Sequence, residues 1–142
     1  MDHFLPEEAL DQIVSAIKTA EQNTTGEIRV HIDNNTLCRN AEKAFEVFTL
    51  LCKDQTAEKN AVLFHINFSQ KYLTIIGDTG IHQKVCQHFW DRLHDETTEE
   101  FAKGNFGSAL EKAILKTGNE LKKHFPSNEK NPNELPDEIT FS

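Results

Sequence analysis

Three oxygen-bearing side chains stand at the ends of apolar runs, where a fold can gather them. Glu27 opens one run, Asn60 precedes a second and Asp78 closes a third. Carboxylate and amide oxygens are the ligands that Ca²⁺ and Mg²⁺ prefer, and main-chain carbonyls can complete the coordination. We therefore predict a Ca²⁺ site, or a Mg²⁺ site, at Glu27, Asn60 and Asp78, with Thr79 and Asp91 as further ligands.

Each of these residues also has an ordinary structural role that the sequence leaves open. Asp78 would stabilise a turn, Glu27 would be a solvated strand start, and Asn60 would cap a loop. Asp78 is also the one candidate for a catalytic residue, because no Ser-His-Asp or Cys-His arrangement can be assembled from the chain.

Glycines flank this aspartate in the segment Gly77-Asp78-Thr79-Gly80, directly before a helical pattern. Backbone N–H groups at such a turn can bind a phosphate. With Arg29 as the nearby cation, Gly77 and Gly80 are predicted to form an anion cradle. The dinucleotide fingerprint and the P-loop sequence are both missing, so we expect no nucleotide cofactor.

Two histidines, His31 and His65, fall on polar positions of alternating runs and are expected side by side on adjacent strands. Arg29 nearby would disfavour their protonation. We interpret the two imidazoles as hydrogen-bonded core groups rather than as metal ligands. The histidines that recur every six residues are spread around a helix and are predicted to be surface residues: His82, His88 and His94.

The elements that position these residues follow from hydrophobic periodicity. A helical pattern begins after Pro6 and ends near Gln22, and the period changes to two over 27–33. A helix with a broad apolar stripe over 41–52 leads to the apolar run 61–67. A strand, a helix and a strand in this order predict two parallel strands.

The next apolar run, 72–76, follows after only four residues, which allows a hairpin but not a crossover. The third strand should therefore be antiparallel and finish where the others start. This topology places Asp78 at the same sheet edge as Glu27 and Asn60. Asp91 would join them only if its helix packs back over that edge.

The rest of the chain completes a three-layer α/β/α sandwich, Rossmann-like, with a small mixed sheet and the element order α-β-α-β-β-α-α. One helix is predicted after Gly80 through Leu93, and 95–100 is expected to be a turn or a second short helix. Ser108 with Glu111 matches a capping box for the last helix, which stops before Pro126. The stripe of that helix comprises Ala109, Leu110, Ala113, Ile114, Thr117 and Leu121.

The domain organisation follows from length and local composition. The chain of 142 residues suits one core, which we place at 1–126. Residues 127–142 are expected to form a flexible linker and a docked acidic tail. Pro136 limits this tail to an edge strand or an extended cover.

The net charge of the chain favours some classes of binding partner over others. With 23 acidic and 15 basic residues the formal charge is −8, so nucleic acid is not expected as a partner, whereas divalent cations and basic proteins are suitable ones. No stretch is apolar over the length of a bilayer, and the first residues do not resemble a signal peptide, so we expect a cytoplasmic monomer.

The three cysteines have no Cys-x-x-Cys spacing, so the sequence predicts neither a disulfide framework nor a zinc ribbon. Cys38, Cys52 and Cys86 are expected to be reduced thiols that are mostly buried.

Five segments occur in a recognisable order and spacing, at 25–30, 59–63, 76–81, 89–91 and 101–106. They resemble the TPM domain family, the TPM phosphatase or thylakoid-lumen phosphatase-like proteins, and the closing residues 124–126 and 134–141 resemble its short stand-alone bacterial branch. The resemblance implies a sheet sandwiched by helices, divalent cation binding near loops at one sheet edge, an acid-phosphatase activity, and roles in assembling or repairing membrane protein complexes. Where relatives often have Asn-Gly before the second strand, this chain has Asn60-Ala61.

Three functions remain open at this point. The first is a Ca²⁺-binding accessory module that presents ordered loops to a protein partner, which is expected to be membrane-associated. The alternative is a metal-assisted acid phosphatase acting on phosphate monoesters, with Arg29, Lys59 and Lys84 as the available cations. The third is an interaction domain without a metal.

Overall fold

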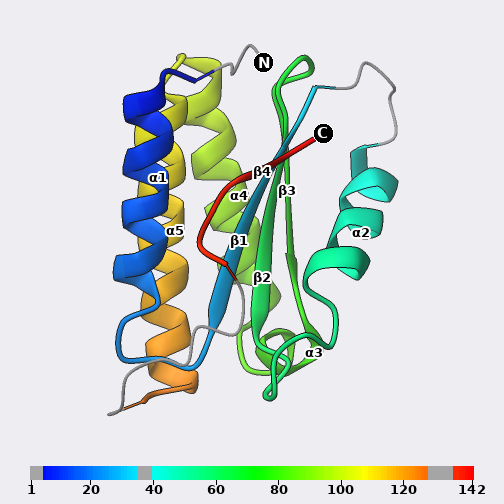
Figure 1. Ribbon diagram of the computed structural model, residues 1–142, viewed down its shortest axis with the longest axis vertical. Helices are drawn as coiled ribbons and strands as arrows, with labels where there is room; N and C mark the ends of the chain where they lie inside the picture. The colour runs from blue at the N-terminus through cyan, green and yellow to red at the C-terminus, as the bar shows by residue number, and fades with distance from the viewer. Residues whose placement is uncertain (1–4, 35–39, 128–135) are drawn as a thin grey trace.

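A mixed sheet of four strands lies at the centre of the fold (Figure 1). The computed structural model describes residues 5–34, 40–127 and 136–142. The strand order is β3-β2-β1-β4. β1 (Glu27–Asp33) and β2 (Ala61–Asn67) are parallel, and β3 (Tyr72–Gly77) is antiparallel to β2. Both predicted pairings are therefore confirmed.

Helices cover both faces of the sheet, as predicted. Figure 1 shows α1 (Glu7–Ala20), α4 (Gln87–Ala102) and α5 (Phe106–His124) on one face and α2 (Asn40–Leu51) on the other. The larger core lies on the first face, where Ile28, Val30 and Ile32 contact the three helices. The smaller core packs Val47 and Phe48 of α2 against Ala61 and Leu63 of β2.

The alternation of β1 divides its side chains between these two faces. Its isoleucines and valine point into the larger core, so the intervening side chains point toward the α2 side. All seven residues of β1 are nevertheless buried. The fold therefore has a layer of polar side chains inside the α2 face: Glu27, Arg29, His31 and Asp33.

The helix predicted after Gly80 is interrupted. A single turn, α3 (Thr79–His82), is followed by non-helical residues, and α4 begins at Gln87. The predicted break at 95–100 is wrong, because α4 continues to Ala102. Leu93, Thr97 and Phe101 recur at intervals of four and are all buried, so packing against α5 extends the helix through its charged segment.

Other local predictions also need correction. α5 starts at Phe106 with Asn105 at the N-cap, so Ser108 lies inside the helix and is not its cap. The apolar stripe predicted over 41–52 is only partly buried, because Phe45 of α2 is 55% exposed while Val47 is buried. Cys52 is buried as expected, but Cys86 is exposed.

The end of the chain adds the fourth strand. β4 (Thr140–Phe141) is parallel to β1, with His31 beside Thr140 and Ile32 beside Phe141. The amide of Ser142 donates to Ile32, and Ser142 accepts from Asn34. The tail thus occupies an edge position, while Cys38 and residues 128–133 of the predicted linker lie outside the described residues.

Candidate functional site at one end of the sheet

The strand register brings the predicted ligands to one end of the sheet. Glu27 lies beside Ala61, and the amide of Asp78 donates to the carbonyl of Ala61 at 2.9 Å. Glu27, Ala61 and Asp78 therefore form one row across three strands. The hairpin argument is correct about this shared edge, although β2 separates the two carboxylate-bearing strands.

Asp78 acts as a structural clamp. Its Oδ1 accepts from the amide of Thr79 at 2.8 Å and caps α3, while its Oδ2 accepts from the amide of Asp54 at 2.9 Å. The side chain is 3% exposed. The sequence left Asp78 open as a cation ligand or as a turn-stabilising residue. These contacts are those of a turn-stabilising residue.

The structure gives no support to the anion cradle at the start of α3. The amides of Thr79, Gly80 and Ile81 all donate to protein oxygens, the last two to the carbonyl of Lys59. A Cβ at Gly80 would lie 2.1 Å from the carbonyl oxygen of Glu58, so this glycine permits a close backbone contact. Arg29 is 5% exposed and lies in the polar layer beneath α2.

Glu27 belongs to a different acidic group from the one predicted. One carboxylate oxygen from each of Glu21, Glu27 and Asp137 lies within 4.8 Å of the other two. These three residues, the acidic trio, come from the end of α1, the start of β1 and the C-terminal tail. Glu27 is fully buried, which excludes the solvated strand start that the sequence left open as an alternative, and Glu21 is 5% exposed.

Burial and the neighbouring carboxyl groups favour the protonated form of Glu21. Burial, together with hydrogen bonds to Asp137 and Glu27, raises the pKa of Glu21 from 4.5 to about 11. Oε2 of Glu21 also accepts from the amide of Ile28 at 2.8 Å, which partly opposes this increase in pKa. The three carboxyl groups thus repel one another wherever they are ionised, and a shared proton or a cation would relieve this repulsion.

Asn60 lies next to this row on the β2 side of Glu27. Its Nδ2 donates to Oγ1 of Thr25 at 3.1 Å, and that hydroxyl donates to Glu58 at 2.9 Å. Asn60 is fully buried, and its Oδ1 has no hydrogen-bond partner among the described residues. An amide oxygen of this kind has an unused capacity to coordinate a cation.

The remaining predicted ligands lie elsewhere. The carbonyl of Thr79 accepts from the amide of Gln83 at 3.1 Å within the turn of α3. Asp91 is exposed on α4, accepts from Gln87 at 3.0 Å, and borders a shallow cleft along the first half of β3. In the described part of the chain, the structure does not bring Asp91 into a group with the other carboxylates of the sheet end.

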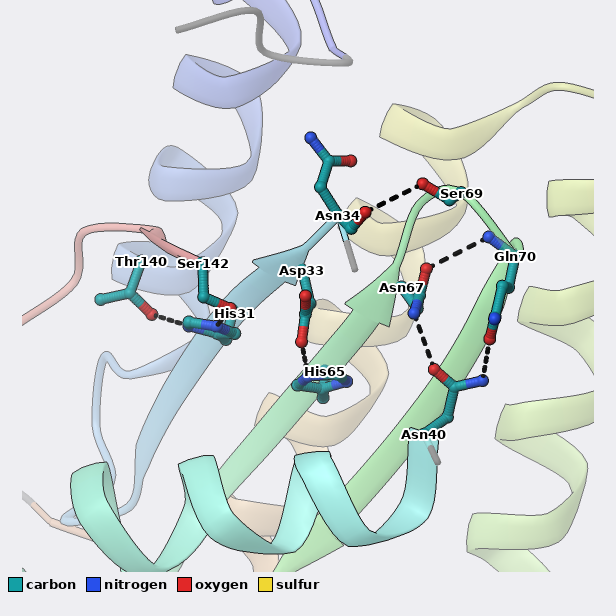
Figure 2. Close-up of polar contacts among 10 residues, drawn as sticks. All are labelled: His31, Asp33, Asn34, Asn40, His65, Asn67, Ser69, Gln70, Thr140 and Ser142. Atoms are coloured by element: carbon teal, nitrogen blue, oxygen red, sulfur yellow. Dashed lines mark hydrogen bonds and ion pairs between the residues drawn. The ribbon is translucent and has the colours of Figure 1, made fainter. Parts of the chain in front are cut away.

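A second group of ligand-type side chains lies further along the same strands, toward their carboxyl ends. His31 and His65 are adjacent in the register, and their rings stack with centroids 5.5 Å apart. Nε2 of His65 lies 3.4 Å from Oδ2 of Asp33. Figure 2 shows this His–Asp–His group (His31, Asp33 and His65) on the sheet beneath α2.

The two imidazoles have different surroundings. Nδ1 of His31 contacts the hydroxyl of Thr140 and Nε2 contacts that of Ser142, each at 2.7 Å, so the tail satisfies both nitrogens (Figure 2). Nδ1 of His65 has no hydrogen-bond partner among the described residues, and Nε2 has only the long contact with Asp33 (Figure 2). The prediction of hydrogen-bonded core imidazoles is therefore correct for His31 only.

Burial keeps both rings neutral. It lowers the pKa of His31 from 6.5 to about 4, with a contribution from His65, while Asp33 opposes the change. Burial likewise lowers the pKa of His65, again against the charge of Asp33. Arg29 contributes to the lowered pKa of His31, as the sequence indicated, but as the smallest cause.

Sequence reasoning missed Glu21 and Asp137 as members of the site. Glu21 sits at the end of a helical pattern, where an exposed polar residue is ordinary, and Asp137 lies in a tail separated from Glu27 by more than a hundred residues. The one feature of the sequence that pointed to Asp137 was the acidic composition of the tail. No periodicity, however, specifies where a short terminal segment docks.

The comparisons with known proteins agree with this architecture. The family model of the TPM domain matches residues 1–120. The chain belongs to the TPM domain family. The NMR structure of the BA42 protein from the psychrophilic bacterium Bizionia argentinensis is 35% identical, with a TM-score of 0.89 over 100% of this chain and 98% of that one.

A more distant solved structure shares the fold. It is the N-terminal domain of a protein from P. gingivalis, with 14% identity, a TM-score of 0.64, and coverage of 88% of this chain and 83% of that one. A search of curated proteins returned no match. Within the described residues of this TPM domain, every helix is too short or too polar to cross a bilayer.

Proposed function

We propose that this TPM domain is a divalent-cation-binding interaction module in which Ca²⁺ binds the acidic trio and secures the C-terminal tail against the domain. The observation that carries the proposal is the convergence of Glu21, Glu27 and Asp137 from three separate segments. Two of the three carboxyl groups are at least nine-tenths buried.

The donor set and its spacing fit a hard cation. Ca²⁺ binds oxygens at about 2.3 to 2.6 Å, so two ligands of one ion lie up to about 5 Å apart. The trio oxygens meet this condition, since all lie within 4.8 Å of one another. Mg²⁺ needs shorter bonds, and would require the carboxylates to move closer together. The unpartnered Oδ1 of Asn60 is a further oxygen near this strand end.

The electrostatics also support a cation here. Without a cation, the raised pKa of Glu21 means that the folded state favours the protonated form of this side chain over the ionised form. A divalent ion would replace that proton and neutralise the buried charge. Because Asp137 belongs to the tail, the ion would couple occupancy of the site to the position of residues 136–142. This coupling would give a protein partner, such as one in a membrane protein complex, a cation-dependent surface.

The phosphatase alternative has less support among the described residues. Of the three candidate cations, Arg29 is buried, and Lys59 is paired with Asp54 at 3.6 Å. The amides that would cradle a phosphate donate internally. We therefore do not propose a catalytic role for Asp78.

Thermal unfolding of the full chain with Ca²⁺, Mg²⁺ or EDTA tests the proposal. Ca²⁺ at a hundred times its Kd should stabilise the domain by about 2.7 kcal/mol, and Mg²⁺ should act more weakly. Replacing Glu27 with Gln should remove the Ca²⁺ effect, whereas Glu46→Gln, an exposed change on α2, should retain it.

The NMR amide signals of residues 24–28 and 136–142 should shift together during the same titration. An unchanged melting temperature at millimolar Ca²⁺ would refute the proposal. So would a Ca²⁺ effect of the same size in the Glu27→Gln variant.

A further inference from the structure

We infer that the His–Asp–His group is a second metal site, selective for transition ions of the Zn²⁺ type, and distinct from the acidic trio. Its three side chains each offer a ligand atom, and these atoms lie within 4.8 Å of one another. Two imidazoles and one carboxylate are a donor set that Zn²⁺, Fe²⁺ and Co²⁺ bind well. Ca²⁺ and Mg²⁺, by contrast, prefer oxygen ligands.

The strand geometry pre-arranges these ligands. Parallel pairing puts His31 and His65 side by side on one face, and Asp33 follows His31 by two residues on that same face. Zn²⁺ binds nitrogen at about 2.0 to 2.1 Å in a tetrahedral arrangement, so two of its ligands lie about 3.4 Å apart. Closing the group around an ion therefore requires the ligand atoms to move closer together and the two stacked rings to turn until their nitrogens face a common centre.

The unusual member of the group is His65. It is fully buried, and its Nδ1 has no hydrogen-bond partner among the described residues, whereas its Nε2 has the carboxylate of Asp33 at 3.4 Å, which is long for a hydrogen bond. Buried polar atoms in native proteins nearly always have a partner at hydrogen-bonding distance. A metal ion between His65, Asp33 and His31 would supply such a partner.

Hydroxyl groups of the C-terminal tail can orient one of the imidazoles. When one nitrogen of His31 binds the metal, the other keeps a hydroxyl of Thr140 or Ser142 as its orienting partner.

Titration of the metal-free full chain with Zn²⁺ and Co²⁺ tests the inference, with binding followed by calorimetry and by the absorption of bound Co²⁺. We expect one ion to bind at this group. The imidazole ¹⁵N signals of His31 and His65 should shift on Zn²⁺ binding, and those of His88, exposed on α4, should not. Excess Ca²⁺ should leave these shifts in place.

Variants separate this site from the acidic trio. His65→Gln should abolish binding at this group, whereas His88→Gln and Glu27→Gln should retain it. If His65→Gln does not fold, as judged by circular dichroism, Asp33→Asn and the wild-type imidazole signals take its place. Unshifted imidazole signals in the presence of Zn²⁺, full binding by a folded His65→Gln or Asp33→Asn variant, or loss of binding in Glu27→Gln alone would overturn the inference.

Discussion

At the scale of single residues, the domain buries ionisable groups that most proteins leave in water. Glu21, Glu27 and His65 are all at most 5% exposed. Burial raises the pKa of Glu21 and lowers that of His65, so the stability of the fold depends on pH. The acidic trio and the His–Asp–His group therefore also reduce the stability of the fold at some pH values.

Glu21 should make the domain less stable as the pH rises. Its folded pKa is about 11 against 4.5 unfolded, so between these values the unfolded state has lost a proton that the folded state retains. Stability falls with pH in this window, by at most about 1.4 kcal/mol per pH unit. Glu21→Gln keeps an acceptor for the amide of Ile28 and removes this dependence.

Urea unfolding in EDTA measures the effect. The stability of Glu21→Gln relative to the wild type should increase steadily from weakly acidic to alkaline pH. Stability curves for the two proteins that stay parallel over this range would contradict the assignment of a raised pKa to Glu21.

At the scale of elements, close helix contacts fix where the acidic trio forms. α1 and α5 pack along their lengths, and α1 ends at Ala20, directly before Glu21. Gly118 of α5 lies against Ala20, where an added Cβ would be 2.6 Å from the Ala20 Cβ and 2.9 Å from its carbonyl oxygen. This contact positions the end of α1 over the start of β1.

Gly118→Ala should destabilise the domain even though alanine favours helix. The clash involves backbone atoms of α1 that cannot rotate away, and overpacking of this kind costs about 1 to 3 kcal/mol. Gly107 provides a control on the same helix, since its added Cβ would meet Ala9 at an ordinary 3.4 Å. Gly107→Ala should be neutral or stabilising by up to about 1 kcal/mol.

Chemical denaturation of both glycine variants decides the matter. The expected result is a lower denaturation midpoint for Gly118→Ala and an equal or higher one for Gly107→Ala. Equal changes in the two variants would show that helix propensity, and not the α1–α5 contact, controls the response.

At the scale of the whole molecule, both polar groups join segments that are distant in the chain. The tail provides Asp137 to the acidic trio, and Thr140 and Ser142 to His31. Asn40 at the start of α2 bonds with Asn67 at 2.8 Å and also with Gln70, which ties α2 to the β2–β3 hairpin above the His–Asp–His group (Figure 2). Closing such long loops is entropically costly and makes the fold cooperative.

The buried histidines should limit stability in acid. The pKa of His31 falls from 6.5 to about 4 on folding, and that of His65 also falls. Below pH 6.5 the unfolded state gains protons that the folded state cannot accept, so stability decreases as the pH falls toward 4. This loss on the acid side opposes the stabilisation that Glu21 gives as the pH falls.

Unfolding free energies of the wild type and of His31→Gln, again in EDTA, isolate the effect of this histidine. The stability of the wild type relative to the variant should decrease as the pH falls from 6.5 toward 4 and should stay constant above this range. A difference between the two proteins that does not change between pH 4 and 6.5 would be inconsistent with a neutral buried His31.

The sequence alone determined the layered fold, the parallel and antiparallel pairings, and the meeting of Glu27, Asn60 and Asp78 at one sheet end. Those features depend on periodicities of two and 3.6 residues and on connection lengths, which are local properties of the chain. The tertiary structure alone decided that Glu27 joins Glu21 and Asp137, that Asp78 is a cap, and that Nδ1 of His65 is buried without a hydrogen-bond partner among the described residues. These outcomes depend on how a helix end and a terminal tail dock, and docking is set by packing and desolvation across the whole molecule, which no local pattern encodes.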